Sequence, residues 1–132
     1  MISTDAYITV MQRQAPRAQG QVVEAAACRY LQQQGLVLLT QNFNARGGEL
    51  DLVMRECDTL VFVEVRFRKN DLFGSPVESV TFSKQKKLLR TAQLYLLAQR
   101  EWQNKPCRFD IVAARPGESG LQFEWIKNAF GA

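Results

Sequence analysis

Segments with the hydrophobic spacing of helices alternate with segments typical of strands. Apolar residues recur every three or four positions after Gln21, and Gly35 follows as a stop, which predicts a helix over residues 20–34. A second helix is predicted over residues 83–102. Apolar runs predict five strands, over residues 36–40, 49–54, 59–68, 108–114 and 121–126. The order of one helix, three strands, one helix and two strands predicts an α/β fold, with a mixed five-stranded sheet flanked by helices.

Polar and turn-forming residues separate these elements. Residues 42–48 (NFNARGG) predict a loop, and residues 74–76 break the chain before the second helix. Residues 1–18 show no sustained period and are expected to form a flexible arm. Residues 19–132 are the size of one domain, and a chain of this length buries roughly two-thirds of its unfolded surface without metal or disulfide staples.

Composition removes several classes of function. The 132 residues include no histidine, which excludes Ser-His and Cys-His catalysis and zinc sites built on histidine. The three cysteines are widely spaced and form no CxxC pair, which is typical of reduced thiols. No apolar run approaches the ~20 residues of a membrane span, and the first residues lack the pattern of a signal peptide. A cytoplasmic protein without membrane contact is therefore expected.

The charge balance is mildly basic and suggests an anionic partner. Seventeen Lys and Arg against 13 Asp and Glu give a net charge of +4, which fits nucleic acid but is shared by many unrelated domains. Lys84, Lys86 and Lys87 stand at a predicted helix start, where a bound phosphate would offset their unfavourable position in the helix dipole. A solvated helix face is the alternative interpretation. Arg46 and Arg68 are further candidates for phosphate contacts.

One carboxylate interrupts the strongest predicted strand. In residues 59–68, alternate positions share a face, so Glu64 lies beside Phe62 and Arg66 on one side of the strand. Burying an unpaired carboxylate costs several kcal/mol, so something must neutralise it. The neutralising group is either a salt-bridge partner such as Arg66 or a cation.

The predicted hairpin decides how many acids meet Glu64. A four-residue turn over residues 55–58 would place Glu49 opposite Glu64, with Asp51 one diagonal step away, whereas an odd turn would put the acids on opposite faces. With the even turn, two or three carboxylates converge within roughly 5–8 Å and raise each other's pKa unless a divalent ion neutralises them. Oxygen ligands without histidine or thiolate suit Mg²⁺ or Mn²⁺. A salt-bridged structural pair is the alternative for Asp51 and Glu64.

These motifs resemble a known family in order as well as in composition. Residues 47–53 (GGELDLV) and 62–68 (FVEVRFR) resemble the D-x(n)-E-x-K core of the PD-(D/E)xK nuclease superfamily. The whole chain from about residue 20 to 130 resembles more closely the YraN family of small bacterial proteins, which implies a restriction-endonuclease-like fold. The motifs that carry this resemblance are Glu24, Gly48-Glu49-Leu50-Asp51-Leu52, Phe62-Val63-Glu64-Val65-Arg66, Lys84, Arg108-Phe109-Asp110-Ile111 and Asn128-Ala129-Phe130.

The resemblance implies roles for individual acids. Asp51 and Glu64 match the metal-binding acids of the superfamily. Glu24 matches the helix glutamate that archaeal Holliday-junction resolvases, related in fold, place beside the metal. An acid near a helix start is also ordinary dipole complementarity, so both interpretations of Glu24 stay open. Glu49 is expected to lie beside the metal ligands or to face solvent, and direct contact with the metal is its less favoured role.

Arg66 departs from the superfamily pattern because it occupies the place of a lysine. Arginine stays protonated and cannot act as a base at neutral pH, but it stabilises negative charge and clamps phosphate. Lys84 is a candidate to supply the missing ammonium. Asp110, beside Arg108 on a later strand, is predicted to form a structural ion pair.

The leading hypothesis is a nuclease that uses Mg²⁺ or Mn²⁺ to hydrolyse DNA phosphodiester bonds. Its catalytic residues would be Glu24, Asp51, Glu64 and Arg66, and the resolvase resemblance suggests branched or repair-associated DNA as the substrate. A non-catalytic nucleic-acid-binding module on the same fold is the alternative, because Arg66 weakens the chemistry. A third hypothesis is an interaction protein that binds neither metal nor nucleic acid. A homodimer is compatible with the leading hypothesis, because cutting both strands often needs two sites.

Overall fold

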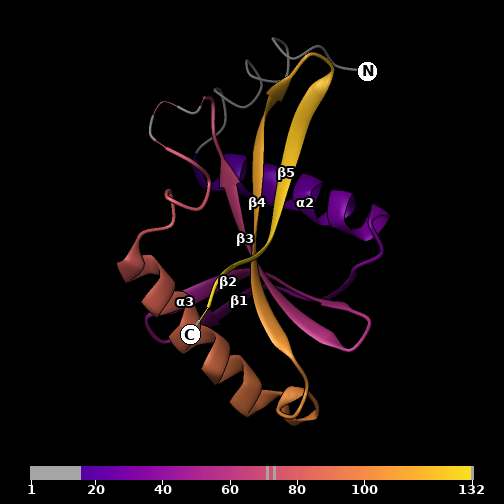
Figure 1. The fold of residues 1–132 in the computed structure, drawn as a ribbon, viewed down its shortest axis with the longest axis vertical. Coiled ribbons are helices and arrows are strands. Elements are labelled where there is room, and N and C mark those ends of the chain that lie inside the picture. Colours follow the sequence, from indigo (N-terminus) through magenta and orange to yellow (C-terminus); the bar gives the residue numbers. More distant parts are fainter. Residues whose placement is uncertain (1–15, 71, 73, 132) are drawn as a thin grey trace.

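In the described part of the chain, two helices and five strands follow one another in the predicted order. The computed structural model describes residues 16–70, 72 and 74–131 (Figure 1). The helices are α2 (Pro16–Gln33) and α3 (Phe82–Ala98), and a 3₁₀ turn, η1, covers Arg100–Trp102. The strands are β1 (Val37–Ala45), β2 (Gly48–Glu56), β3 (Thr59–Phe67), β4 (Cys107–Gly117) and β5 (Gly120–Phe130).

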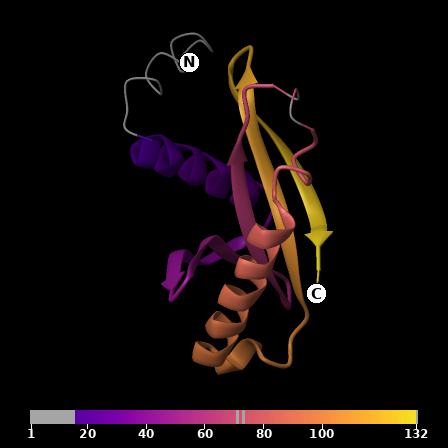
Figure 2. The ribbon, with the colours of Figure 1, turned by 90° about the vertical axis from the view of Figure 1, so that its left-hand side faces the viewer.

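The strands form one mixed sheet in the order β1-β2-β3-β4-β5. Strands β3 and β4 are parallel, joined by a crossover through α3, and the other neighbours are antiparallel. Alternate residues of β3 face different helices: Phe62 packs in a cluster with α3, and Val61 packs in a cluster with α2. The helices therefore cover opposite faces of the sheet (Figures 1 and 2). This architecture confirms the predicted α/β fold with a five-stranded mixed sheet and agrees with a restriction-endonuclease-like fold.

The sheet divides into a fork beside the middle of β3. The β2–β3 ladder ends at the pair Leu52 and Val63, whereas β3 continues alongside β4 as far as Phe67 and Ala114. Figure 1 shows β1 and β2 turning away below this point. Val23 of α2 packs against Ala114 and the end of β3, so the helix covers the strand that β2 has left.

Several boundaries differ from the sequence predictions, and two of the differences have local reasons. Residues 42–48 were expected to form a loop, but β1 and β2 run through them to a tight turn at Arg46 and Gly47. Asn42 adopts a φ of 53°, a conformation that asparagine tolerates better than most residues, so the strand bends there without ending. The second helix ends at Ala98, because Gln99 leaves the helical conformation, and residues 100–102 form the separate 3₁₀ turn.

The predicted arm over residues 1–18 is wrong for its last three residues, because α2 begins at Pro16. Residues 1–15 of that arm lie outside the described residues. None of the helices in the described part of the chain is long and apolar enough to cross a membrane.

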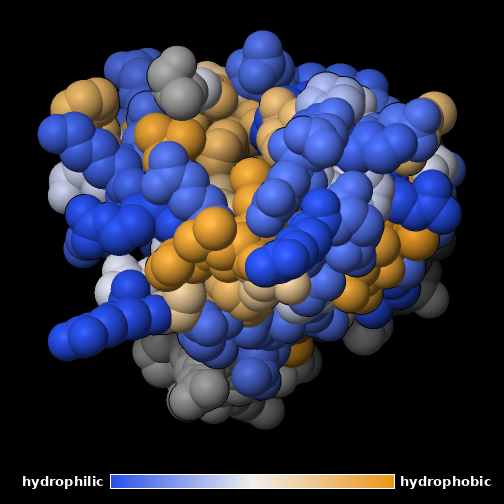
Figure 3. Space-filling view, turned by 90° about the horizontal axis from the view of Figure 1, so that it is seen from below, coloured by the Kyte–Doolittle hydropathy of each residue, from blue (hydrophilic) through white to orange (hydrophobic). Residues whose placement is uncertain are grey.

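Apolar side chains also reach the surface at the lower end of the molecule. Figure 3 shows them gathered on this face among hydrophilic neighbours. The exposed large apolar residues include Val37 and Leu39 of β1 and Leu94 and Leu97 of α3.

Candidate active site

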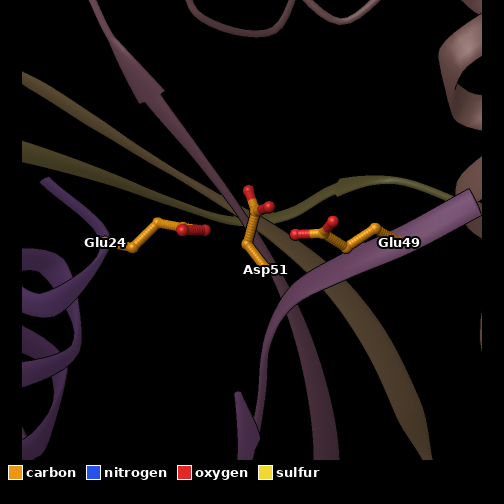
Figure 4. A group of neighbouring side chains, drawn as sticks. All are labelled: Glu24, Glu49 and Asp51. Atoms are coloured by element: carbon orange, nitrogen blue, oxygen red, sulfur yellow. The ribbon is translucent and has the colours of Figure 1, made fainter. Parts of the chain in front are cut away.

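Three carboxylates from two elements converge at the fork. Figure 4 shows Glu24 of α2 and Glu49 of β2 pointing toward Asp51, which lies between them. One carboxylate oxygen from each residue lies within 4.8 Å of the other two. Glu49 is exposed and the other two are half-buried, so the cluster is open to solvent from one side.

Asp51 reaches the cluster because the β2–β3 hairpin has an even turn. The ladder closes at Glu56 and Thr59, so the turn has two residues, Cys57 and Asp58, where four were expected. Because the number of turn residues is still even, the acids stay on one face, but the β2–β3 register differs by two positions from the expected one. The expected pairing of Glu49 with Glu64 is therefore wrong, and Asp51 follows the last ladder pair directly beside Glu64.

The end of the ladder also holds the Asp51 side chain in place. Its Oδ2 accepts a hydrogen bond from the backbone N–H of Val65 at 2.9 Å. Val65 lies just beyond the last pair of the β2–β3 ladder, where β2 no longer supplies an acceptor. The Asp51 carboxylate thus replaces a strand partner at the fork.

Glu64 is the most buried acid of the site, with 6% of its side chain exposed. Burial and the adjacent Asp51 raise its pKa to about 8, although Lys84 and Arg66 act in the opposite direction. Arg66 Nη2 lies 3.4 Å and Lys84 Nζ 3.7 Å from Glu64 Oε2. The structure thus brings Glu64 together with Asp51 on one side and with two cations on the other.

Glu24 carries the second perturbed carboxyl. Partial burial, Asp51 and Glu49 raise its pKa to about 7. Asn42, with its amide nitrogen oriented toward the cluster, donates hydrogen bonds to Glu49 Oε1 at 3.0 Å and Glu24 Oε1 at 3.1 Å. Sequence reasoning assigned Asn42 to a loop and missed this contact, which depends on the bend of β1.

The donor set at the fork suits a hard divalent cation. Glu24, Glu49 and Asp51 supply only carboxylate oxygens, and Asn42 offers a neutral amide next to them. Mg²⁺ and Mn²⁺ favour such ligands, and a cation here would relieve the repulsion that raises the carboxyl pKa values. Glu49, expected beside the ligands or facing solvent, stands inside this group, and Glu64 adjoins it through Asp51.

Comparison with known proteins identifies the family. The model described as "Uncharacterised protein family UPF0102" matches residues 23–114. The chain belongs to the UPF0102 family. A UPF0102 protein of Pseudomonas putida is 48% identical over 117 residues, which cover 88% of this chain and 95% of the relative. A UPF0102 protein of Pseudomonas syringae pv. syringae is 49% identical over 122 residues, covering 91% and 98%. Another, from Stutzerimonas stutzeri, is 46% identical over 114 residues, covering 86% and 95%.

The UPF0102 match confirms the resemblance to the YraN family, and the matched residues include the site. All four acids, Arg66 and Lys84 lie within residues 23–114. The names of these relatives give the family alone.

The predicted phosphate-binding cations are distributed unequally around the site. Lys84 lies in the first turn of α3, where Thr81 accepts a hydrogen bond from its backbone N–H, and its ammonium faces Glu64. Arg68 follows β3 and donates to the carbonyl of Gly74. Lys86 stacks over the exposed ring of Phe82. Lys87 and Arg46 are exposed, Arg46 in the turn between β1 and β2.

Asp110 is confirmed as a structural acid. It is fully buried and accepts hydrogen bonds from Arg108 Nε, Trp125 Nε1 and the backbone N–H of Asn128. With both oxygens bonded to β4 and β5, it has no part in the cluster at the fork.

Proposed function

We propose that this UPF0102 protein is a metal-dependent nuclease that hydrolyses DNA phosphodiester bonds. The observation that carries the proposal is the convergence of three carboxylates within 4.8 Å at the fork, beside a fourth acid that two cations flank. Glu24, Glu49 and Asp51 would hold Mg²⁺ or Mn²⁺. The bound ion would orient a water and stabilise the negative charge of the phosphodiester transition state.

The residues around the acids supply complementary functions. Lys84 and Arg66 place positive charge on the side of Glu64, where a phosphate would need it. Arg66 remains protonated and therefore acts by charge, not as a base. Asn42 orients Glu24 and Glu49 through its two hydrogen bonds. The resemblance to resolvases makes branched or repair-associated DNA the first substrate class to examine.

Metal binding is the first test of this proposal. We would titrate Mn²⁺ into the wild type and into Asp51→Asn, Glu24→Gln and Glu101→Gln by calorimetry. Glu101 is an exposed acid of η1 and serves as the matched control. Binding that Asp51→Asn and Glu24→Gln weaken at least about tenfold, and that Glu101→Gln leaves unchanged, is the expected result. Equal binding by all four proteins would contradict the assigned site.

Cleavage is the second test and separates the nuclease from a binding module. Labelled single-stranded, duplex and branched DNA would be incubated with the protein in Mg²⁺ or Mn²⁺, with Asp51→Asn as the inactive control. Cleavage by the wild type alone is expected. Salt-dependent DNA binding without cleavage, in a protein that binds Mn²⁺ at the fork, would instead favour the non-catalytic module that Arg66 suggests.

A further inference from the structure

A groove opens beside the end of β3, where Arg68 follows the strand. Its volume is about 810 Å³, within the range of sites that hold small molecules. One wall is formed by Arg68 and residues 74–76. The remaining lining comes from β4 and β5 and includes Ala113, Arg115, Gln122 and Glu124.

Glu64 and two arginines that lead toward the groove lie along one face of β3. Glu64, Arg66 and Arg68 occupy every second position, so their side chains leave the strand on the same side. Arg66 is the register partner of Ala113, which lines the groove. Four residue steps of extended backbone lead from Glu64 to Arg68, a span of ~13 Å. A DNA strand that follows this face of β3 from Glu64 would therefore reach the groove.

Two guanidinium groups on this path have hydrogen-bonding capacity to spare. Among the described residues, Arg66 Nε and Arg68 Nη1 are buried and have no hydrogen-bond partner. The other bonds of these groups hold them in place, from Arg66 to Glu64 and from Arg68 to the Gly74 carbonyl. A buried donor without an acceptor costs about 1–3 kcal/mol, and a rotation of each side chain toward the groove would let a phosphate's oxygens satisfy its donor.

The opposite side of the groove has a different chemistry. Gln122 and Glu124 of β5 offer amide and carboxylate groups, and the Glu124 charge disfavours a phosphate close to it. Such groups bind the donors and acceptors on the edge of a base. In a duplex, the Watson–Crick edge is already occupied by the partner base. The groove therefore matches a nucleotide whose base is unpaired.

We propose that the groove binds an unpaired nucleotide of the substrate strand next to the cleavage site. Arg66 and Arg68 hold its phosphate, and Gln122 and Glu124 contact its base. The proposal rests on the proposed nuclease function and names its substrate class, DNA with a single-stranded stretch beside the cut.

The test compares blunt duplex DNA with the same duplex carrying a single-stranded overhang. Affinities would be measured by fluorescence anisotropy in EDTA, so that no strand is cut. The wild type is expected to prefer the overhang roughly tenfold, and Arg68→Gln to lose most of that preference. Its salt slope should also fall by about 1. Arg100→Gln removes the same charge from η1 at the lower end of the molecule and should keep the preference (Figure 1).

A second variant tests the base contact without touching Arg68. Glu124→Gln should weaken binding of a cytosine overhang, whose N4 amino group donates to the carboxylate, more than binding of a thymine overhang. Circular dichroism would confirm that both variants are folded. If Glu124→Gln weakened binding of the cytosine and thymine overhangs equally, the placement of the base beside Glu124 would be overturned.

The outcomes separate this proposal from the nuclease function. Equal affinities of the wild type for blunt and overhang DNA, or equal behaviour of Arg68→Gln and Arg100→Gln, would overturn the groove as a nucleotide site. Cleavage by the wild type in Mg²⁺ would still support the nuclease. A wild type that neither binds nor cuts DNA would overturn both proposals.

Discussion

Buried acids in this protein differ by the groups that face them. Asp110 meets three hydrogen-bond donors on β4 and β5 and is fully enclosed. Glu64 is almost as buried, but another carboxylate lies beside it and raises its pKa. The first arrangement stabilises the fold, whereas the second makes ionisation of Glu64 unfavourable, and such shifted pKa values are typical of functional sites.

Replacing Asp110 with alanine should destabilise the fold without altering the metal site. The change leaves Arg108 and the Trp125 N–H without their buried acceptor, so we expect the free energy of unfolding to fall by about 3 kcal/mol. Urea denaturation would measure it. The control is Asp58→Ala, which removes an exposed ion pair with Lys105 and should cost under about 0.5 kcal/mol. Equal losses would contradict the structural role of Asp110.

The raised pKa values predict how stability depends on pH. In the folded protein Glu24 has a pKa of about 7 and Glu64 of about 8, both above the ordinary value of 4.5. The folded state therefore binds protons more tightly than the unfolded state, and the free energy of unfolding should fall as pH rises from about 5 to 8. Urea denaturation without divalent ions, at pH steps across this range, would measure the fall.

The composition makes this pH range easy to interpret. The chain has no histidine, and burial raises the pKa of the Cys28 and Cys107 thiols, so few other groups titrate there. Glu24→Gln should flatten the part of the profile near pH 7. A profile that rises with pH, or that Glu24→Gln leaves unchanged, would contradict the repulsion inferred at the fork.

At the scale of elements, the periodicity of apolar residues predicted which segments form helices and strands but not where those elements end. The strand β3 at residues 59–67 and both helices follow from apolar spacing, which depends on burial alone. The extension of β1 through Asn42 could not be predicted, because it depends on pairing with β2 and on the φ of 53° that Asn42 adopts. The same long-range pairing decides whether Asn42 reaches the acids.

Part of the site was predictable because strand alternation and the parity of a turn decide which side chains share a face. An even turn was enough to place Asp51 and Glu64 on one face, whatever its length. The exact partner was not predictable, because the choice between a two-residue and a four-residue turn moves Glu49 relative to Glu64. The inclusion of Glu49 with Glu24 depends on the fork and on the packing of α2, neither of which has a local signal.

The contact between β2 and α3 predicts an effect of substitution at Gly48. A Cβ at Gly48 would come within 2.2 Å of Thr91 Oγ1, so β2 and α3 could not keep their spacing. We expect Gly48→Ala to lower the free energy of unfolding by about 1–3 kcal/mol. The double variant Gly48→Ala with Thr91→Ala should lose less than the sum of the two single variants, because it removes the clashing hydroxyl.

A matched glycine controls for the effect of adding a methyl group. Gly20 lies on the exposed surface of α2 with no atom within 4 Å of an added Cβ. Gly20→Ala should therefore stabilise the helix by about 0.5–1 kcal/mol. Urea denaturation of all four variants would measure these changes in the free energy of unfolding. A loss in the double variant equal to the sum of the losses in Gly48→Ala and Thr91→Ala would contradict the clash.

At the scale of the whole molecule, the fork concentrates charge where three elements meet. Helix α2, strand β2 and strand β3 each contribute an acid, and β2 and β3 are no longer paired at that point. Repulsion among the acids therefore acts between elements that the sheet does not tie together. A cation bound there would join α2 to β2 at the point where β2 leaves β3.

Divalent metal should consequently stabilise the protein and reverse its dependence on pH. A ligand at 100 times its dissociation constant adds about 2.7 kcal/mol to the free energy of unfolding. Because metal binds the deprotonated carboxylates, this gain should grow as pH rises from 5 to 8, opposing the loss expected without metal. Urea denaturation with and without Mn²⁺, at ionic strength matched with NaCl, would measure both trends. Asp51→Asn removes the central ligand and should abolish the gain. An equal gain in Asp51→Asn would show that Mn²⁺ binds elsewhere, and the fork would then need another explanation for its acids.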